Sequence, residues 1–482
     1  MQSRTGNLTE GPIGRSLLLF SLPILAGNVA QSLNGSVNAV WVGRYLGEAA
    51  LTATANANNI LFFLLGSMFG IGMASTILIG QAMGAGDTAQ ARRVMGTSAS
   101  FFIGISVIVA LAGWLLAPRL LAAMGTPPAS LPLAIAYLRV IFLAMPVLYA
   151  FAFLSAALRG AGDSRTPFRF LMLSVLLDIG FNPLLIFGLG PLPRLGIAGA
   201  AWATLAAQVM SLAALLLYLR HKRHVLWLGR RDAALFRPNL PILRALVVKG
   251  VPMGLQMVLI SLAMIAMIAM MTMVNRYGTH TTAAYGAAMQ LWTYVQMPAM
   301  AIGAACSSMA AQNVGANRWD RVSATAGYGV LFNFLLTGAL IAPLILLDRW
   351  TLALFLPAGS EALEIARHLN HIAVWSFLFF GVTFVISGVV RSTGAVIPPL
   401  VILAISLWGI RVPFAEMLQP VLGADAVWWS FPTSAVCAML MSMAYYRWGR
   451  WRRAHMLVGP DTVAVPAEVP ATPPSPVADP GK

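Results

Sequence analysis

Deep inside one apolar stretch of the sequence lies an acidic residue, Asp178. The other Asp and Glu residues fall in polar segments or near the ends of apolar ones. Asn182 follows four residues later, so both side chains would project from one face of a helix. Pro183 would free a backbone carbonyl as a further ligand. A carboxylate at membrane depth costs several kcal/mol, so the pattern predicts a proton or cation site. A simple hydrogen bond to a neighbouring helix is the alternative.

A second pattern consists of amide side chains between residues 28 and 38. Asn28, Gln31, Asn34 and Asn38 recur at helical spacing and would cover about 120° of arc. Because such a stripe cannot face lipid hydrocarbon, we expect it to line an interior cavity. Hydrogen bonds that only hold helices together are the alternative interpretation.

Two apolar segments in the second half of the sequence hold further candidates for this cavity. They offer amides, aromatic rings and a flexible thioether, which suit a site for ligands of varied shape. These candidates are Gln256, Met257, Gln290, Trp292 and Tyr294. The many methionines around Met257 point all round the helix, so only some of them can face a ligand.

The composition defines the protein class. The chain of 482 residues is 59% hydrophobic and only 10% charged, with a mean hydropathy of +0.79, whereas soluble domains are about 25% charged. This predicts an integral membrane protein of long helices rather than a barrel of alternating strands. The His and Cys residues lack metal-ligand spacing, and no phosphate-binding loop is followed by Lys-Ser/Thr. We therefore expect no enzymatic activity, no cofactor and no structural metal.

We expect twelve transmembrane helices. Their predicted ranges are 16–43, 49–81, 95–117, 131–158, 166–190, 197–219, 246–275, 282–312, 323–347, 369–391, 396–419 and 427–447. Most of the 31 Lys and Arg residues then lie on the side of the membrane that holds the N-terminus. This bias places both termini in the cytoplasm. The net charge of +16 is thus a topology signal, and no nucleic-acid partner is expected.

The chain is internally duplicated. Residues 42–45, 81–85 and 158–162 each recur in similar form about 232 positions later. Six helices per half is an even number, so the two copies would cross the membrane in the same orientation, as parallel repeats around a central cleft. The predicted organisation is a cytoplasmic N-terminus (1–15), a first lobe (16–219), a basic linker (220–245), a second lobe (246–447) and a basic, then Pro-rich disordered tail (448–482).

Several segments resemble the MATE (multidrug and toxic compound extrusion) family of transporters. They are the duplicated 42–47, then 81–85, 158–163, 182–188 with 196–201, and 408–413. The resemblance spans about residues 15–455 and implies two six-helix lobes that export organic cations in exchange for H⁺ or Na⁺. It is closer to the bacterial DinF-like members than to the NorM-like members, because acids in the seventh and tenth helices are absent.

The resemblance also implies a coupling-ion site in the first lobe. DinF-like members usually carry an acid in the first helix, an Asn followed by an acid in the fifth and a Thr in the sixth. Here the first-helix position is Asn38, the fifth-helix pair is reversed to Asp178 and Asn182, and Thr204 matches. One carboxylate replaces two, so we expect H⁺ rather than Na⁺ as the coupling ion, although Na⁺ at Asp178 stays open.

The predicted function is therefore a monomeric secondary antiporter of the bacterial inner membrane that exports lipophilic organic cations by rocking of its lobes. The alternative within the same superfamily is a flippase for a lipid-linked precursor. Its anionic pyrophosphate would need Arg or Lys in the cleft, and we expect none deep in the first lobe. A membrane protein that transports nothing is the other alternative, which the duplication and the polar stripe disfavour.

Overall fold

The computed structural model describes residues 7–188, 194–275, 278–357 and 359–456, and these residues form helices and connecting loops without any strand. The first lobe consists of six long helices. They are α1 (Ile13–Leu46), α2 (Glu48–Gly84), α3 (Thr88–Ala123), α4 (Leu131–Gly160), α5 (Arg165–Phe187) and α6 (Ile197–His221). A short 3-10 helix, η1 (Arg230–Phe236), follows in the basic segment between the lobes.

The second lobe is built from more helical pieces. They are α7 (Leu240–Asn275), α8 (Thr279–Val295), α9 (Met297–Gly315), α10 (Trp319–Leu346), α11 (Asp348–Leu352), α12 (Glu361–Ala373), α13 (Ser376–Arg391), α14 (Ile397–Ala404), the π-helix η2 (Ile405–Arg411), α15 (Val412–Leu422) and α16 (Asp425–Trp448), with η3 (Trp451–Arg453) after them. Three spans predicted as single helices are interrupted. One of them contains the junction of α12 and α13, where the helix bends. A second breaks at Gln296, two residues before Pro298. The third contains η2, just before Pro413. Proline lacks the N–H that an unbroken helix needs at the latter two positions.

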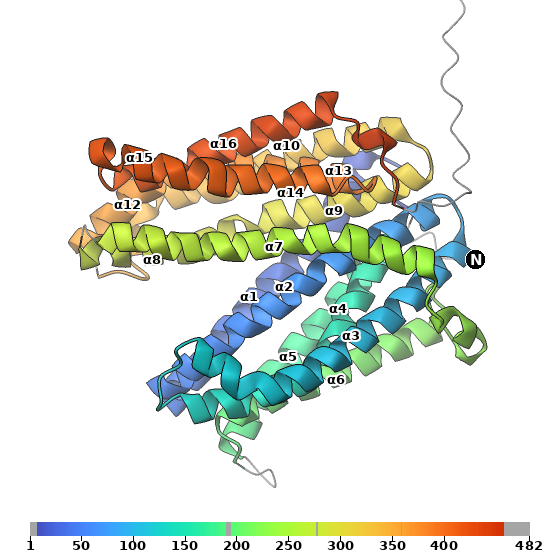
Figure 1. The fold of residues 1–482 in the computed structure, drawn as a ribbon, viewed down its shortest axis with the longest axis horizontal. Helices are drawn as coiled ribbons and strands as arrows, with labels where there is room; N and C mark the ends of the chain where they lie inside the picture. Colours follow the sequence, from blue (N-terminus) through green and yellow to red (C-terminus); the bar gives the residue numbers. More distant parts are fainter. Residues whose placement is uncertain (1–6, 189–193, 276–277, 358, 457–482) are drawn as a thin grey trace, which may run out of the picture.

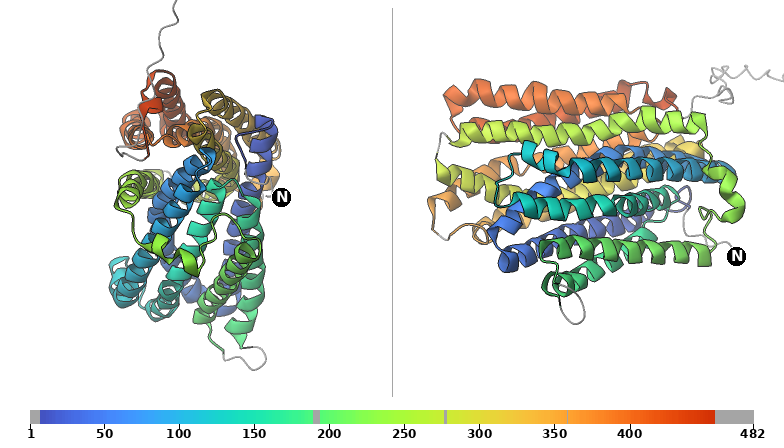
Figure 2. Two further views of the ribbon diagram at one scale, coloured as in Figure 1. Left: turned by 90° about the vertical axis from the view of Figure 1, so that its right-hand side faces the viewer. Right: turned by 60° about the horizontal axis from the view of Figure 1, so that its bottom comes forward.

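The helices agree with a twelve-span bundle. Ten helices in the described residues are long and apolar enough to cross a membrane, and α12 with α13, bent by 40°, makes an eleventh span. The remaining expected span is the pair α8 and α9, which meet at Gln296. Helices of both lobes run along the same long direction (Figure 2). In Figure 1 the lobes meet near the N-terminus and splay apart toward the opposite end, hereafter the splayed end.

Close backbone contact joins the lobes near the N-terminus. At the end of α2, Gln81 donates from Nε2 to the carbonyl oxygen of Ser392 at 2.6 Å. Its repeat counterpart in α9, Gln312, donates to the carbonyl oxygen of Gly160 at 2.9 Å. Gly84 allows this approach, because a Cβ atom there would lie 1.8 Å from the backbone oxygen of Gln312. The duplicated motifs therefore form a reciprocal contact between the two lobes.

A charged cluster lies near the splayed end of the second lobe. Asp348, which is 4% exposed, accepts hydrogen bonds from Arg367 Nε at 3.0 Å and from His371 Nε2 at 2.8 Å. Burial alone would raise the pKa of the Asp348 carboxyl. The hydrogen bonds from His371 and Arg367 nevertheless hold that pKa below its usual range. This Asp348 cluster (Asp348, Arg367 and His371) connects the start of α11 to α12.

Candidate functional site

The structure brings the four predicted ion-site residues together around Asp178, which is 2% exposed on α5. From α1, Asn34 Nδ2 at 2.7 Å and Asn38 Nδ2 at 3.0 Å both donate to Asp178 Oδ2. From α6, Thr204 Oγ1 donates to Oδ1 at 3.0 Å. Asn182, one turn along α5, donates to Oδ1 at 3.3 Å and to the side-chain oxygen of Asn38 at 2.8 Å. These five residues are called the Asp178 cluster below.

In this cluster the Asp178 carboxylate only accepts hydrogen bonds, and two nearby amide oxygens accept none within the described part of the chain. All four side-chain groups that contact the carboxylate donate hydrogen bonds to it. Two amide oxygens, Asn34 Oδ1 and Asn182 Oδ1, are buried and have no partner in the described residues. A buried polar atom without a partner costs about 1–3 kcal/mol. The cluster therefore holds oxygens that are available to a cation or to a proton on the carboxylate.

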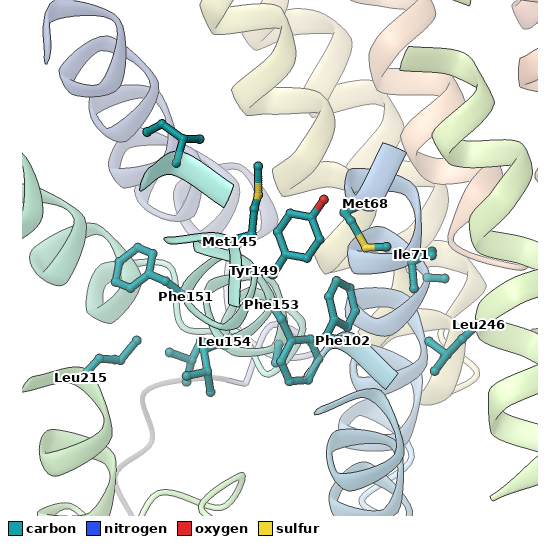
Figure 3. Close-up of a cluster of buried hydrophobic side chains, with 14 of the residues drawn as sticks. Met68, Ile71, Phe102, Met145, Tyr149, Phe151, Phe153, Leu154, Leu215 and Leu246 are labelled. Atoms are coloured by element: carbon teal, nitrogen blue, oxygen red, sulfur yellow. The ribbon is translucent and has the colours of Figure 1, made fainter. Parts of the chain in front are cut away.

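A cavity of about 420 Å³ lies next to this cluster, among α1, α2, α3, α4, α5, α6 and α9. We call it the main pocket. Its walls are largely apolar, and Figure 3 shows several of its lining side chains within the packed interior of the first lobe: Met68, Phe102, Tyr149, Phe151 and Phe153. A volume of this order suits a small organic ligand.

Two helices carry residues of both the main pocket and the Asp178 cluster. On α1, Gln31 lines the pocket and Asn34 contacts Asp178. On α6, Gln208 lines the pocket and Thr204 contacts Asp178. Since these pairs are only three or four residues apart, the pocket and the cluster lie about one helical turn from each other. The amide stripe of α1 is thus divided between the two.

The structure places the cleft residues predicted in the second lobe in different surroundings. Gln256 and Met257 line a smaller cavity of about 50 Å³, beside the main pocket. Gln290 is exposed and Tyr294 is 37% exposed, and neither lines the described pockets. The placement of Trp292 in the cleft is wrong. Its ring is 2% exposed, and its Nε1 donates to Asn370 at 2.9 Å inside the second lobe.

Arg159 is the functional candidate that sequence reasoning missed. We expected no Arg or Lys deep in the first lobe, but Arg159 at the end of α4 lines the main pocket. Its neighbour Gly160 packs against α2, where a Cβ atom would lie 2.5 Å from the oxygen of Thr76. The signal available in the sequence was the Arg retained in both copies of the 158–162 motif.

No set of three or more His, Cys, Asp or Glu residues that could hold a metal ion occurs in the described part of the chain. The two cysteines, Cys306 and Cys437, are free. The polar groups near the main pocket are therefore amides, hydroxyls, one carboxylate and one guanidinium.

Known proteins resemble two thirds or more of the chain. The MatE family model matches residues 23–184 and 252–417, one segment in each lobe. The probable multidrug resistance protein YoeA of Bacillus subtilis is 36% identical over 92% of this chain and 95% of its own length. The FAD transporter of Shewanella oneidensis is 30% identical over 67% of this chain and 69% of its own.

Solved structures of the same architecture exist. A crystal structure of MATE in complex with MaD3S superposes with a TM-score of 0.83 at 21% identity, and the match covers 94% of this chain and 98% of that one. At this identity the likeness concerns the fold, including its twelve-span, two-lobe arrangement. Together with the family model and the relatives, it shows that the chain belongs to the MATE family of membrane transporters.

Proposed function

We propose that this transporter is an ion-coupled antiporter that exports lipophilic organic molecules by alternating access of its two lobes. The proposal rests on one observation: the same two helices, α1 and α6, carry residues of both the proposed ion site and the main pocket. Helix α1 supplies Asn34 and Asn38 to the Asp178 cluster and Gln31 to the main pocket. Helix α6 supplies Thr204 to the cluster and Gln208, about one turn away, to the pocket. A change in one site therefore moves the walls of the other.

Coupling requires that the ion prefers one conformation of the lobes over the other. An ionised Asp178 draws Asn34 and Asn38 of α1 toward α5. Protonation removes the charge that attracts these amides, so α1 is released from α5. Because Gln31 and Asn28 lie on the same helix and line the pocket, this movement changes the shape of the substrate site.

H⁺ is the proposed coupling ion. A Na⁺ ion would need about five or six oxygen ligands and a compensating negative charge, and the cluster supplies one carboxylate with neutral oxygens. Asn34 Oδ1 and Asn182 Oδ1, both without a partner, are available to accept the hydrogen bond of a protonated Asp178. The same two oxygens are also the strongest argument for the Na⁺ alternative, so the experiment separates the two ions.

The substrate is proposed to be a small amphipathic molecule. YoeA is named a probable multidrug resistance protein, and the Shewanella relative is named an FAD transporter. Family membership therefore does not determine the charge of the cargo. A pocket of about 420 Å³ favours a compact ligand over a lipid-linked oligosaccharide precursor.

The proposed location is the bacterial inner membrane, with the lipid bilayer as the surroundings of a monomer and both termini in the cytoplasm. The bias of Lys and Arg toward the end of the bundle that carries the N-terminus supports this orientation. The contact between the lobes then closes the cytoplasmic side, and the splayed end faces outward. No cofactor is proposed beyond the exchanged ion.

Efflux from proteoliposomes tests the proposal. Purified transporter is reconstituted with an entrapped fluorescent amphiphile, and a pH gradient and a Na⁺ gradient are imposed in separate experiments. Export driven by external acidification without Na⁺ supports H⁺ antiport. Export that needs Na⁺ and ignores pH would overturn the choice of ion, and export of no compound under either gradient would overturn the antiporter function.

A further inference from the structure

We propose that the main pocket binds the anionic head group of an amphipathic organic substrate, with Arg159 as the charged contact. This inference rests on the export function proposed above and names the chemical class of its cargo, an organic carboxylate or phosphate with an apolar body. It replaces the organic cation predicted from the family resemblance.

The first argument is the state of Arg159 itself. Arg159 lines the main pocket, and no hydrogen bond, ion pair or ring contact joins its side chain to another side chain in the described residues. It is half-buried next to the last residue of α4, where a cation that lacks a paired anion depends on contact with water. Arginine is also the side chain best suited to bind carboxylate and phosphate through parallel hydrogen bonds. An anion in the pocket would supply the missing partner.

The second argument is the set of unpaired polar groups around the same cavity. Ser155, one turn before Arg159 on α4, is 7% exposed, and Ser307 of the other lobe is 1% exposed. Both hydroxyls line the main pocket and have no hydrogen-bond partner in the described residues. Hydroxyl groups can donate hydrogen bonds that an anionic head group accepts. The pocket thus contains unused donors as well as an unused positive charge.

The third argument comes from the duplication. Arg391, the repeat counterpart of Arg159, donates from its guanidinium to Gln256 Oε1 at 2.5 Å. Gln256 stands four residues after Pro252 on α7. The corresponding residue four after Pro23 on α1 is Gly27, which has no side chain and lines the main pocket. Arg391 also lines the smaller cavity, and its Nε has no partner in the described residues. It nevertheless donates to a side chain of its own lobe, whereas Arg159 has no side-chain partner in the described residues.

The fourth argument concerns what a cation would meet. No Asp or Glu belongs to the described lining of the main pocket, and Asp178 binds its own donors one turn away. A cationic ligand would lie near an unneutralised guanidinium without a carboxylate of its own. The apolar body of an amphiphile fits the remaining walls, where Phe69, Phe102 and Phe168 contribute aromatic surface.

Three pyrene probes that share one apolar body test the inference: 1-pyrenebutyrate, its neutral alcohol and a trimethylammonium analogue. Binding to the transporter in nanodiscs of neutral lipid is measured by energy transfer from tryptophan, with empty nanodiscs subtracted. The expected result is that the anion binds at least about tenfold more tightly than the cation. Arg159→Gln should remove this preference, because a charge-assisted contact is worth about that factor or more, and leave binding of the alcohol unchanged.

Two further variants separate the charge from the fold. Arg159→Lys should keep most of the preference for the anion. Arg165→Gln, which removes an exposed arginine outside the described pockets, should behave as the unsubstituted protein. If the cation binds as tightly as the anion, or if Arg159→Gln leaves the preference intact, the inference is overturned.

The same probes distinguish this inference from the proposed function in proteoliposomes. Gradient-driven export of the cation, together with no binding of the anion, would refute the anionic substrate and leave the antiporter standing. Arg159-dependent binding of the anion without export of any probe would refute the antiporter and leave the binding site standing.

Discussion

Replacing Asp178 with Asn is the most direct test of the ion site. The carboxylate accepts from four donors, two on each oxygen. An amide keeps only one acceptor oxygen, so its nitrogen would face two of these donors. Rotation of Asn34 relieves part of this conflict, because its free Oδ1 can then accept from the new amide. About one buried donor stays unpaired, which costs about 1–3 kcal/mol.

That penalty is smaller than the stability of a typical folded protein, about 5–15 kcal/mol, so Asp178→Asn should fold and reach the membrane. Its transport should fall to the level of empty liposomes, because the variant has no carboxylate at position 178 to exchange a proton. The assay is dye efflux after external acidification at equal protein density, with a thermal melt as the control for folding. Near-normal efflux by a folded Asp178→Asn protein would refute Asp178 as the coupling residue.

Other positions yield three further expectations. Asn38→Asp adds a second carboxylate to the Asp178 cluster and should make the initial transport rate rise with Na⁺ at fixed pH; an unchanged response would show that Asn38 does not share the ion site. Gly84→Val should abolish export by keeping the lobes apart near the N-terminus, whereas Gly104→Val, where nothing lies within 4 Å, should not; normal export by Gly84→Val would contradict a required contact. The lowered pKa of Asp348 means that its stabilisation is present above the ordinary Asp pKa, about 3.9, and is lost as pH falls through the folded value. Melting temperatures should therefore drop in acid for the unsubstituted protein, and Asp348→Asn should be destabilised by about 2 kcal/mol at neutral pH with a flatter acid profile; equal profiles would contradict this role.

The sequence predicts the bundle well because long apolar runs have one stable solution in a bilayer, the helix. The sequence is less informative about whether one helix crosses the membrane without a break. Around Gln296 and within 405–411, hydropathy stays high while prolines interrupt the backbone hydrogen bonding, so the breaks leave no trace in an apolarity profile. The bend between α12 and α13 depends likewise on packing against neighbouring helices.

The grouping of the Asp178 cluster was predictable because its residues share helix faces. Asp178 and Asn182 are one turn apart, and the α1 amides form one stripe, so local periodicity was enough to group them. The pocket depended on tertiary packing instead. Trp292 has the same pattern whether it faces a cavity or the lobe interior, and only its contact with Asn370 decides. Arg159 lies at a helix end, where a basic residue usually contacts water or lipid head groups.

The two proposals together determine how the transporter would use the membrane potential. An organic cation that leaves in exchange for one H⁺ moves no net charge, so only the pH gradient drives it. An organic monoanion bound at Arg159 that leaves as one H⁺ enters at Asp178 moves two positive charges inward per cycle. The potential contributes about 2.3 kcal/mol per charge at 100 mV, so about twice that amount adds to the pH gradient. A positively charged pocket next to a single carboxylate is therefore an arrangement in which both components of the proton-motive force act in the direction of export.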